Sequence, residues 1–510
     1  MNASNDHRKG VILLAICLAA LVLPMSFTGG AIARPAIGHE LGGSAVQLTW
    51  ITNAFMLTFG SLLMAAGALA DQYGRKRLFT LGTGLFSLTS FAQGFAPSVL
   101  WLDVLRAVQG VAGAAALASG SAALAQEFEG HARTKAFSML GTTFGIGLAF
   151  GPLIAGLLIG SFGWRAIFFA TAALGALSML FGLPRMCESR DPEASGLDWP
   201  GTLTFTGTLA AFTFGVIQGP GSGWTSPLVV ALLGASLVFL AGFVWVEKRA
   251  ARPMLDLSLF RIPSFVGAQI LPIGTCYCYI VLVVILPLRF IGVEGKSEIQ
   301  AGLMMLALSA PMLFVPALAA YLTRWVAPGI LCGCGFLIAA LGLQWFSSIE
   351  VGRGGVELAL PMLLIGVGAG LPWGLMDGLA IGVVPKERAG MATGIFNTAR
   401  VAGEGIALAI ASAVLASLVQ SYLLNSVSFA GSDVANAAQQ VAAGELVHAL
   451  EAVSEVTREV LVGSYSRAFQ VLLRILTVIT LASAAAVFAC FSRPDSDRNA
   501  CTHAVDTQQS

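Results

Sequence analysis

Five ionisable residues lie inside long apolar segments, where ordinary surface groups are not expected. They are Asp103, Arg106, Asp377, Arg400 and Glu404. If these segments cross a bilayer, each charge costs about 2.5–3.5 kcal/mol or more, so the side chains should face a cavity or a partner and mark a path for ions or substrate. Carboxyl groups beside an arginine can bind protons reversibly, because the proton affinity of a buried carboxyl depends on whether a cation lies next to it.

Three of these residues are expected to meet. Asp377 lies about 12 Å into its segment, counted from Pro385 at 1.5 Å per helical residue. Arg400 lies about 15 Å into the next segment, counted from Gly390, and a short connection joins the two segments on that side. Glu404 follows Arg400 by one helical turn on the same face. We expect an Asp377–Arg400–Glu404 cluster that binds protons or a cationic substrate; a permanently paired, purely structural cluster is the alternative.

The composition places these segments in a membrane. The chain has 510 residues, of which 56% are hydrophobic and only 11% are charged, whereas soluble domains usually carry about 25% charged residues. A net charge of +1 without a basic stripe argues against a nucleic-acid partner. No His lies deep in an apolar segment, no catalytic or nucleotide-binding motif is present, and the paired Cys lack zinc-ligand spacing. We therefore expect no enzyme, no catalytic residue and no metal site.

Apolar runs of roughly 20 residues, the length that crosses the hydrocarbon of a bilayer as a helix, recur along the whole chain. They predict an all-α polytopic membrane protein, in which the first run is an uncleaved span. An even number of spans puts both termini on one side, and with that side cytoplasmic the inner segments hold most of the 28 Lys and Arg residues. The fourteen predicted spans are 11–33, 46–69, 78–97, 100–126, 135–159, 165–184, 199–218, 226–246, 263–288, 300–322, 328–347, 357–383, 391–418 and 468–491.

Weak internal repeats divide the chain into two related halves. ARTKAFSMLGTTFGIGLAFGP, which begins at Ala132, is loosely similar to ERAGMATGIFNTARVAGEGIA, which begins at Glu387. Halves of this kind place a binding site at their interface, near the middle of the bilayer. We expect a six-helix bundle at 1–184, an inserted two-helix hairpin with its inner loops at 185–262, a second six-helix bundle at 263–491, and a cytoplasmic tail at 492–510.

One connection is long. Residues of about 419–467 form an outer segment rich in Ala, Glu and Gln, whose apolar spacing predicts an amphipathic helix. A solvated helical loop and a docking surface, for example for a periplasmic adaptor, are both compatible with this pattern.

The stretch GALADQYGRKR, which begins at Gly67, places an acid and three basic residues between two apolar runs. Gly67 and Gly74 permit close approach and a tight turn, while Asp71 can pair with Arg75 beside Lys76. The stretch resembles the G-x-L-A-D-x-x-G-R-[RK] loop of the major facilitator superfamily. The resemblance implies that these five residues form a latch between the halves, made and broken as a carrier alternates; a solvated basic loop is the alternative.

Two further motifs are similar to those of the same family. Arg106, Gln109 and Gly110 resemble its fourth-helix R-x-x-Q-G motif, and Asp103, three residues before Arg106 on the same face, is expected to pair with it. GIGLAFGPLIAG resembles the fifth-helix motif of its exporters, in which a proline removes a backbone hydrogen bond and bends the helix. The matching residues are Gly145, Gly151, Pro152 and Gly156.

The stretches at 197–224, 246–265 and 387–400 resemble the fourteen-helix drug:proton antiporters of the EmrB/QacA type. This resemblance implies a secondary active transporter of the bacterial inner membrane that exports small amphipathic drug-like molecules in exchange for protons by alternating access. Its partners would be the substrate, protons and lipid, with no cofactor and the proton gradient as the energy source.

One residue departs from that family's pattern, because Ser26 stands where its first helix usually carries an acid. The departure leaves two interpretations open. Proton coupling has moved to the C-terminal half, or the chain exports a metabolite, siderophore or lipid-like substrate without proton coupling.

Overall fold

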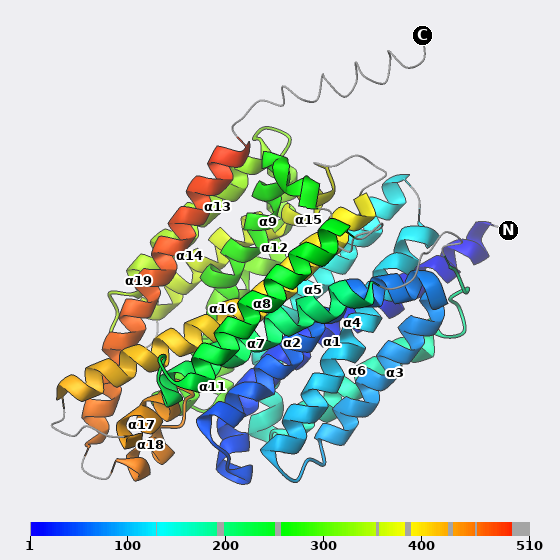
Figure 1. The fold of residues 1–510 in the computed structure, drawn as a ribbon. Coiled ribbons are helices and arrows are strands. Elements are labelled where there is room, and N and C mark those ends of the chain that lie inside the picture. Colours follow the sequence, from blue (N-terminus) through cyan, green and yellow to red (C-terminus); the bar gives the residue numbers. More distant parts are fainter. Residues whose placement is uncertain are drawn as a thin grey trace.

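The computed structural model describes residues 2–128, 130–190, 198–249, 257–352, 356–382, 389–426, 432–453 and 456–491. Within these ranges every regular element is a helix and no strand is present, so the all-α prediction is confirmed (Figure 1).

The N-terminal half consists of long helices that begin at polar caps. The Ser44 side chain accepts a hydrogen bond from the Gln47 backbone N–H at the start of the second helix, and Ser98 accepts one from Trp101 at the start of the fourth. The helices are α1 (Asn2–Leu41), α2 (Ala45–Tyr73), α3 (Arg75–Gln93), α4 (Val99–Glu127), α5 (Gly130–Phe162) and α6 (Arg165–Gly182).

Several spans of the C-terminal half are built from more than one helix, because proline and π-helical turns interrupt them. The inserted hairpin precedes this half and consists of α7 (Trp199–Ser222) and α8 (Pro227–Arg249). The remaining elements are the 3₁₀ helix η1 (Leu257–Arg261), α9 (Pro263–Thr275), the π-helix η2 (Cys276–Ile280), α10 (Val281–Leu288), the π-helix η3 (Arg289–Val293), α11 (Glu298–Ser309), α12 (Pro311–Leu322), α13 (Pro328–Phe346), α14 (Val356–Trp373), α15 (Met376–Gly382), α16 (Ala389–Ser426), α17 (Ser432–Ala442), α18 (Leu446–Ala452) and α19 (Arg458–Phe491).

The described residues contain 12 helices long and apolar enough to cross a membrane, or up to 13 if the bent α5 is one span. The bend of 43° in α5 lies just after Leu148, whose carbonyl loses its hydrogen-bond donor because Pro152 has no N–H. α3 has 19 residues but begins with three basic residues, which lower its apolarity. A total of fourteen spans therefore remains a prediction.

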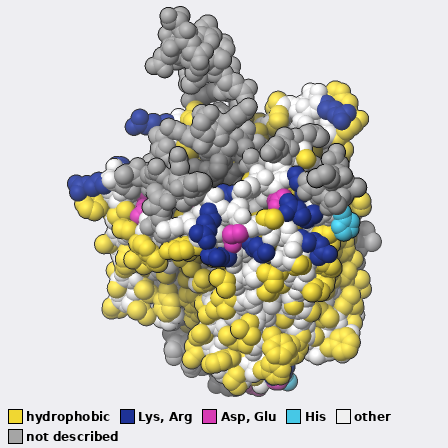
Figure 2. Space-filling model, turned by 90° about the vertical axis from the view of Figure 1, so that its right-hand side faces the viewer, with side chains coloured by type: hydrophobic (Ala, Val, Ile, Leu, Met, Phe, Trp, Pro, Cys, Tyr) yellow, Lys and Arg dark blue, Asp and Glu magenta, His cyan; other side chains and the backbone are white. Residues whose placement is uncertain are grey.

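Large apolar side chains cover much of the surface. Leu81, Leu88, Leu237, Val238 and Phe314 are each 65–73% exposed, which suits contact with lipid rather than water. We call the end of the bundle where α1 begins and α19 ends the near end. The opposite end, where α17 and α18 lie, is called the far end (Figure 1). Figure 2 shows the apolar surface below a band of Lys and Arg side chains that lies toward the near end.

The inserted hairpin lies along one seam between the halves. α7 packs against α2 of the N-terminal half and against α16 of the C-terminal half. Val216 and Ile217 of α7 form a buried apolar cluster with Ala409 and Ala413 of α16. α8 covers the outside of α7, and most of its side chains remain exposed.

The long connection at 419–467 is shorter and more buried than the sequence suggested. α16 continues to Ser426 and α19 already begins at Arg458, because both helices extend beyond their apolar runs. The expected amphipathic helix is α17, but its apolar residues Val434, Ala437 and Val441 are at most 4% exposed. They pack against the bundle, so the expectation of a solvated loop is wrong for this face.

An acidic residue joins this connection to α1. Glu445, between α17 and α18, is 6% exposed, and its Oε2 lies 3.5 Å from Nδ1 of His448. Burial raises the pKa of Glu445, an effect that nearby Arg34 opposes. A Cβ atom at Gly38 would lie 2.7 Å from Glu445 Oε1, so a larger residue there would require this carboxylate to shift.

The two halves touch through their backbones where α2 meets α16. A Cβ atom at Gly60 would lie 2.8 Å from the backbone nitrogen and 2.9 Å from the Cα atom of Ala402. Small residues permit helices to approach this closely in a membrane. Contact between the halves at this point therefore depends on Gly60.

We predict that Gly60→Ala lowers the stability of the protein by about 1–3 kcal/mol, because the added methyl group must push two backbones apart. Thermal unfolding of the purified protein in detergent measures the loss. Gly234→Ala is the matched control, since a Cβ atom there meets nothing within 4 Å. Equal melting temperatures for the two variants would contradict the close packing of α2 on α16.

Candidate functional site

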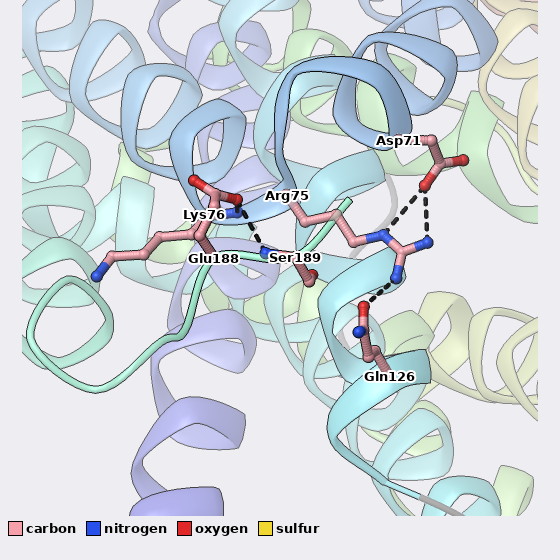
Figure 3. Close-up of polar contacts among 6 residues, drawn as sticks. All are labelled: Asp71, Arg75, Lys76, Gln126, Glu188 and Ser189. Carbon is pink, nitrogen blue, oxygen red and sulfur yellow. Dashed lines mark hydrogen bonds and ion pairs between the residues drawn. The ribbon is translucent and has the colours of Figure 1, made fainter. Parts of the chain in front are cut away.

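The predicted latch residues lie at the near end: Gly67 and Asp71 in the last two turns of α2, Gly74 between the helices, and Arg75 and Lys76 at the start of α3. Arg75 donates from Nε and Nη2 to Asp71 Oδ1, at 3.0 and 2.8 Å, and from Nη1 to Gln126 of α4 (Figure 3). Gly74 has φ +115°, a left-handed conformation that favours glycine. Lys76 follows Arg75 in the first turn of α3.

Two parts of the latch prediction differ from the structure. Close approach was expected at Gly67, but a Cβ atom there would meet nothing within 4 Å, so its role in packing was overestimated. Among the described residues, the side-chain hydrogen bonds and ion pairs of Asp71 and Arg75 all lie within the N-terminal half. A latch between the halves therefore remains a prediction.

Arg106 lies in the core of the N-terminal half and is fully buried. Its Nε donates to the Ile51 carbonyl of α2 at 2.7 Å, and its Nη1 donates to Ser26 Oγ of α1 at 2.8 Å. Nη1 also donates to Gln109 Oε1 at 2.7 Å, and the guanidinium lies 4.5 Å from the centroid of the Phe55 ring. The positive charge is thus held by neutral acceptors and an aromatic face.

The expected ion pair between Asp103 and Arg106 is not formed. The nitrogens of Arg106 point toward α1 and α2 instead, where the Ile51 carbonyl and Ser26 accept their hydrogen bonds. Asp103 Oδ1 has no hydrogen-bond partner among the described residues. A spacing of three residues puts two side chains on one helix face. The long arginine side chain can nevertheless turn into the core, where the short aspartate side chain cannot reach it.

Gln109 is the centre of this polar network. Its Nε2 donates to Ser90 Oγ at 2.6 Å, and its Oε1 accepts from Gln93 Nε2 at 3.1 Å. Ser90 and Gln93 belong to α3 and were missed by the sequence analysis, although two polar residues three apart in an apolar run are a usable signal. Gly110 leaves room for α2, since a Cβ atom there would clash with the Phe55 carbonyl.

The structure brings two of the three predicted cluster residues together. Arg400 Nη1 of α16 lies 3.7 Å from Asp377 Oδ1 of α15. The Arg400 side chain is 8% exposed, whereas that of Asp377 is 51% exposed. Three aromatic rings surround the guanidinium, with centroids 5.0 Å away for Phe144 of α5, 5.8 Å for Trp373 of α14 and 6.0 Å for Phe396.

Glu404 stands apart from that pair. It is 2% exposed, and its Oε1 has no hydrogen-bond partner among the described residues. No ion pair links it to Arg400 within 4.0 Å in the described part of the chain, although one helical turn separates them. A buried carboxyl without a partner is costly as an anion, so this group can take up a proton or a cation.

The sequence model of the Major Facilitator Superfamily matches residues 14–408, which is more than half of the chain. The chain belongs to the Major Facilitator Superfamily. Membership confirms the family predicted from the motifs and makes the protein a multi-pass membrane transporter rather than an enzyme.

Relatives of this superfamily member include bacterial resistance proteins. It is 33% identical over 416 residues to the multidrug resistance protein Stp of Mycobacterium tuberculosis, covering 81% of this chain and 76% of Stp. It is 33% identical over 431 residues to the puromycin resistance protein pur8 of Streptomyces alboniger, covering 82% and 84%. Identity to the tetracenomycin C resistance and export protein of Streptomyces glaucescens is 29% over 409 residues, covering 80% and 76%.

Solved transporters share the fold. The crystal structure of a bacterial homolog of the human lysosomal transporter Spinster, in an inward-facing and unoccupied conformation, matches with a TM-score of 0.62 over 95% of this chain and 97% of that one. The crystal structure of the human organic anion transporter MFSD10 matches with a TM-score of 0.59 over 94% and 99%. Their identities of 17% and 16% make this a likeness of fold alone.

The α5 motif of this superfamily member brings helices close together. A Cβ atom at Gly151 would clash with the Thr28 side chain of α1, and one at Gly156 would clash with the Glu298 backbone at the start of α11. A Cβ atom at Gly145 would lie 3.6 Å from Trp373 Nε1 of α14. Two of these glycines, Gly145 and Gly156, therefore lie where α5 meets the other half.

We predict that Gln109→Ala destabilises the protein by about 1–3 kcal/mol, because it leaves Arg106 Nη1, Gln93 and Ser90 short of buried hydrogen-bond partners. Thermal unfolding in detergent measures the effect. Gln218→Ala is the control, since the Gln218 side chain bonds only to exposed Ser222 among the described residues. If both variants have the same melting temperature as the wild type, the network does not stabilise the N-terminal half.

Proposed function

We propose that this transporter exports small amphipathic drug-like molecules across the bacterial inner membrane in exchange for protons. The observation that carries the proposal is the ion pair between Arg400 and a half-exposed Asp377. Glu404, which is buried and has no hydrogen-bond partner at Oε1 among the described residues, lies one helical turn from Arg400. Membership of the superfamily and the resistance proteins among its relatives support the export of drugs.

The substrate class follows from the side chains around Arg400. Phe144, Trp373 and Phe396 are at most 6% exposed in this conformation, and they would contact an apolar substrate body once the surrounding helices separate. Asp377 offers a carboxylate that is paired with Arg400 yet remains exposed, so it can attract a cationic group. Aromatic surface beside a carboxylate suits an amphipathic cation.

Proton coupling can use the same residues. When Arg400 pairs with Asp377, it favours the anionic form of that carboxylate, whereas Glu404 has no ion pair among the described residues to offset its burial. If Arg400 moves one helical turn toward Glu404, Glu404 gains the cation and Asp377 loses it. Substrate binding at Asp377 would favour that movement and release the proton from Glu404, so the proton gradient can drive export without a cofactor.

The arrangement of the halves supports alternating access. At the far end α5 and α11 are in close contact, since a Cβ atom at Gly302 would lie 3.1 Å from the Leu153 Cα atom. The Lys and Arg band toward the near end supports a cytoplasmic near end, with both termini in the cytoplasm (Figure 2). In this orientation the described conformation is closed between α5 and α11 on the outer side.

A second candidate function is export of a metabolite, siderophore or lipid-like substrate without proton coupling. The observation that favours it is the neutral surrounding of Arg106, because Ser26 supplies a hydroxyl where the related antiporters usually carry an acid. In this case Asp377 and Arg400 form a permanent structural pair. A periplasmic adaptor remains a proposed partner of the far end.

We predict that Glu404→Gln abolishes coupled transport or lowers it at least about tenfold, because it removes the proton-binding group. Inverted membrane vesicles, acidified inside, are challenged with puromycin or with cationic dyes, and alkalinisation of the lumen is recorded. Glu350→Gln is the control, since Glu350 is an exposed carboxylate in a loop.

If the Glu404→Gln variant causes as much alkalinisation as the wild type, Glu404 does not take part in proton coupling. Absence of any response in the wild type, across all the cations, would instead favour the second candidate function.

A further inference from the structure

A short strap after α6 runs across the near end of the N-terminal half. It consists of residues 186–189, and each of its four residues is anchored. The Met186 side chain is 4% exposed and packs in an apolar cluster, and Cys187 Sγ accepts a hydrogen bond from Arg8 Nη1 of α1 at 2.9 Å. The Ser189 carbonyl accepts a hydrogen bond from the Arg75 backbone N–H at 3.0 Å.

Glu188 of the strap binds the start of α3. Its Oε1 accepts from the Lys76 backbone N–H at 3.1 Å (Figure 3). Its Oε2 accepts from the Arg77 backbone N–H at 3.2 Å. The Arg77 side chain adds an ion pair, with Nε 3.6 Å from Oε2. With the bond from Arg75 to Ser189, the first three N–H groups of α3, which no helical carbonyl can satisfy, all have acceptors in the strap.

α3 needs such a partner because its own sequence provides none. The residue at its N-cap is Gly74, which has no side chain to cap the helix, and its first turn contains no acid. Arg75, Lys76 and Arg77 instead place three cations at the positive end of the helix dipole, which is unfavourable. The carboxylate of Glu188 offsets both the unpaired N–H groups and this charge.

The turn is shaped to admit that carboxylate. A Cβ atom at Gly74 would lie 2.5 Å from Glu188 Oε1, so a side chain at this position would displace the Glu188 carboxylate. From the same turn, the Arg75 side chain reaches Asp71 of α2 and Gln126 of α4. The backbone of Arg75 is thus fixed by the strap while its guanidinium joins two other helices.

We propose that Glu188 is a positioning residue for the latch: it holds the first turn of α3 so that the Arg75 guanidinium stays aligned with Asp71. The part that concerns transport rests on the proposed function. Along the chain, the strap precedes α7, which begins at Trp199.

Hydrogen exchange tests the anchoring without any substrate. In the purified full-length protein, Glu188→Ala should raise the exchange rate of the Lys76 and Arg77 amides at least about tenfold, because both lose their acceptors. Arg77→Ala is the matched control, since it removes only the ion pair of a side chain that is 68% exposed. Unchanged exchange in Glu188→Ala would overturn the proposal.

A double-mutant cycle separates positioning from simple capping. If Glu188 acts through Arg75, the fall in melting temperature caused by Glu188→Ala should shrink in an Arg75→Ala background. The same fall in both backgrounds would show that Glu188 only caps α3, and would overturn the positioning role.

Transport gives a third measurement, with puromycin as the probe in proteoliposomes. Glu188→Ala should lower the maximal rate several-fold at unchanged KM, and Glu188→Asp should restore part of it. An unchanged maximal rate, or a raised KM alone, would contradict a role in switching. If the wild type does not move puromycin, the proposed substrate class fails for this drug, while hydrogen exchange and the cycle still decide the role of Glu188.

Discussion

A positive charge buried in an apolar bundle must find acceptors, and this requirement organises both halves of the transporter. Arg106 finds three neutral oxygens on α1, α2 and α4, and those bonds join the three helices in one rigid group. Arg400 instead forms an ion pair with Asp377 of α15, while Glu404, one turn along its own helix, stays outside ion-pair distance. The first arginine therefore has three partners, whereas in the proposed mechanism the second exchanges one carboxyl partner for the other.

Two contacts between the halves are made by glycines. Gly60 meets the Ala402 backbone, and Gly302 meets α5, without long side chains interlocking at these positions. Small residues bring the backbones close, yet they present few side chains that must leave a pocket before the helices can move. Polar networks such as that of Gln109 lie inside one half. This division suits two rigid bodies that rock against each other.

Sequence patterns predicted the all-helical fold and the family, because long apolar runs and glycine motifs leave few alternatives in a bilayer. They did not predict in which direction each side chain points, and therefore which ion pairs form. Asp103 and Arg106 share a face without pairing, and Glu404 and Arg400 do so as well, because the direction of a side chain depends on tertiary neighbours. Glu188 was also missed, since its partners are more than one hundred residues away in the sequence.

The position of α7 makes the two seams of the molecule unequal. Its described contacts include α2 and α16, so on that seam the hairpin stands between the halves and the surrounding lipid. On the other side, α5 meets α11 and α12 directly. A hydrophobic molecule that diffuses within one leaflet thus encounters two different flanks, one shielded by an extra helix pair. The flank formed by α5, α11 and α12 is accordingly the one at which the two halves themselves meet the lipid.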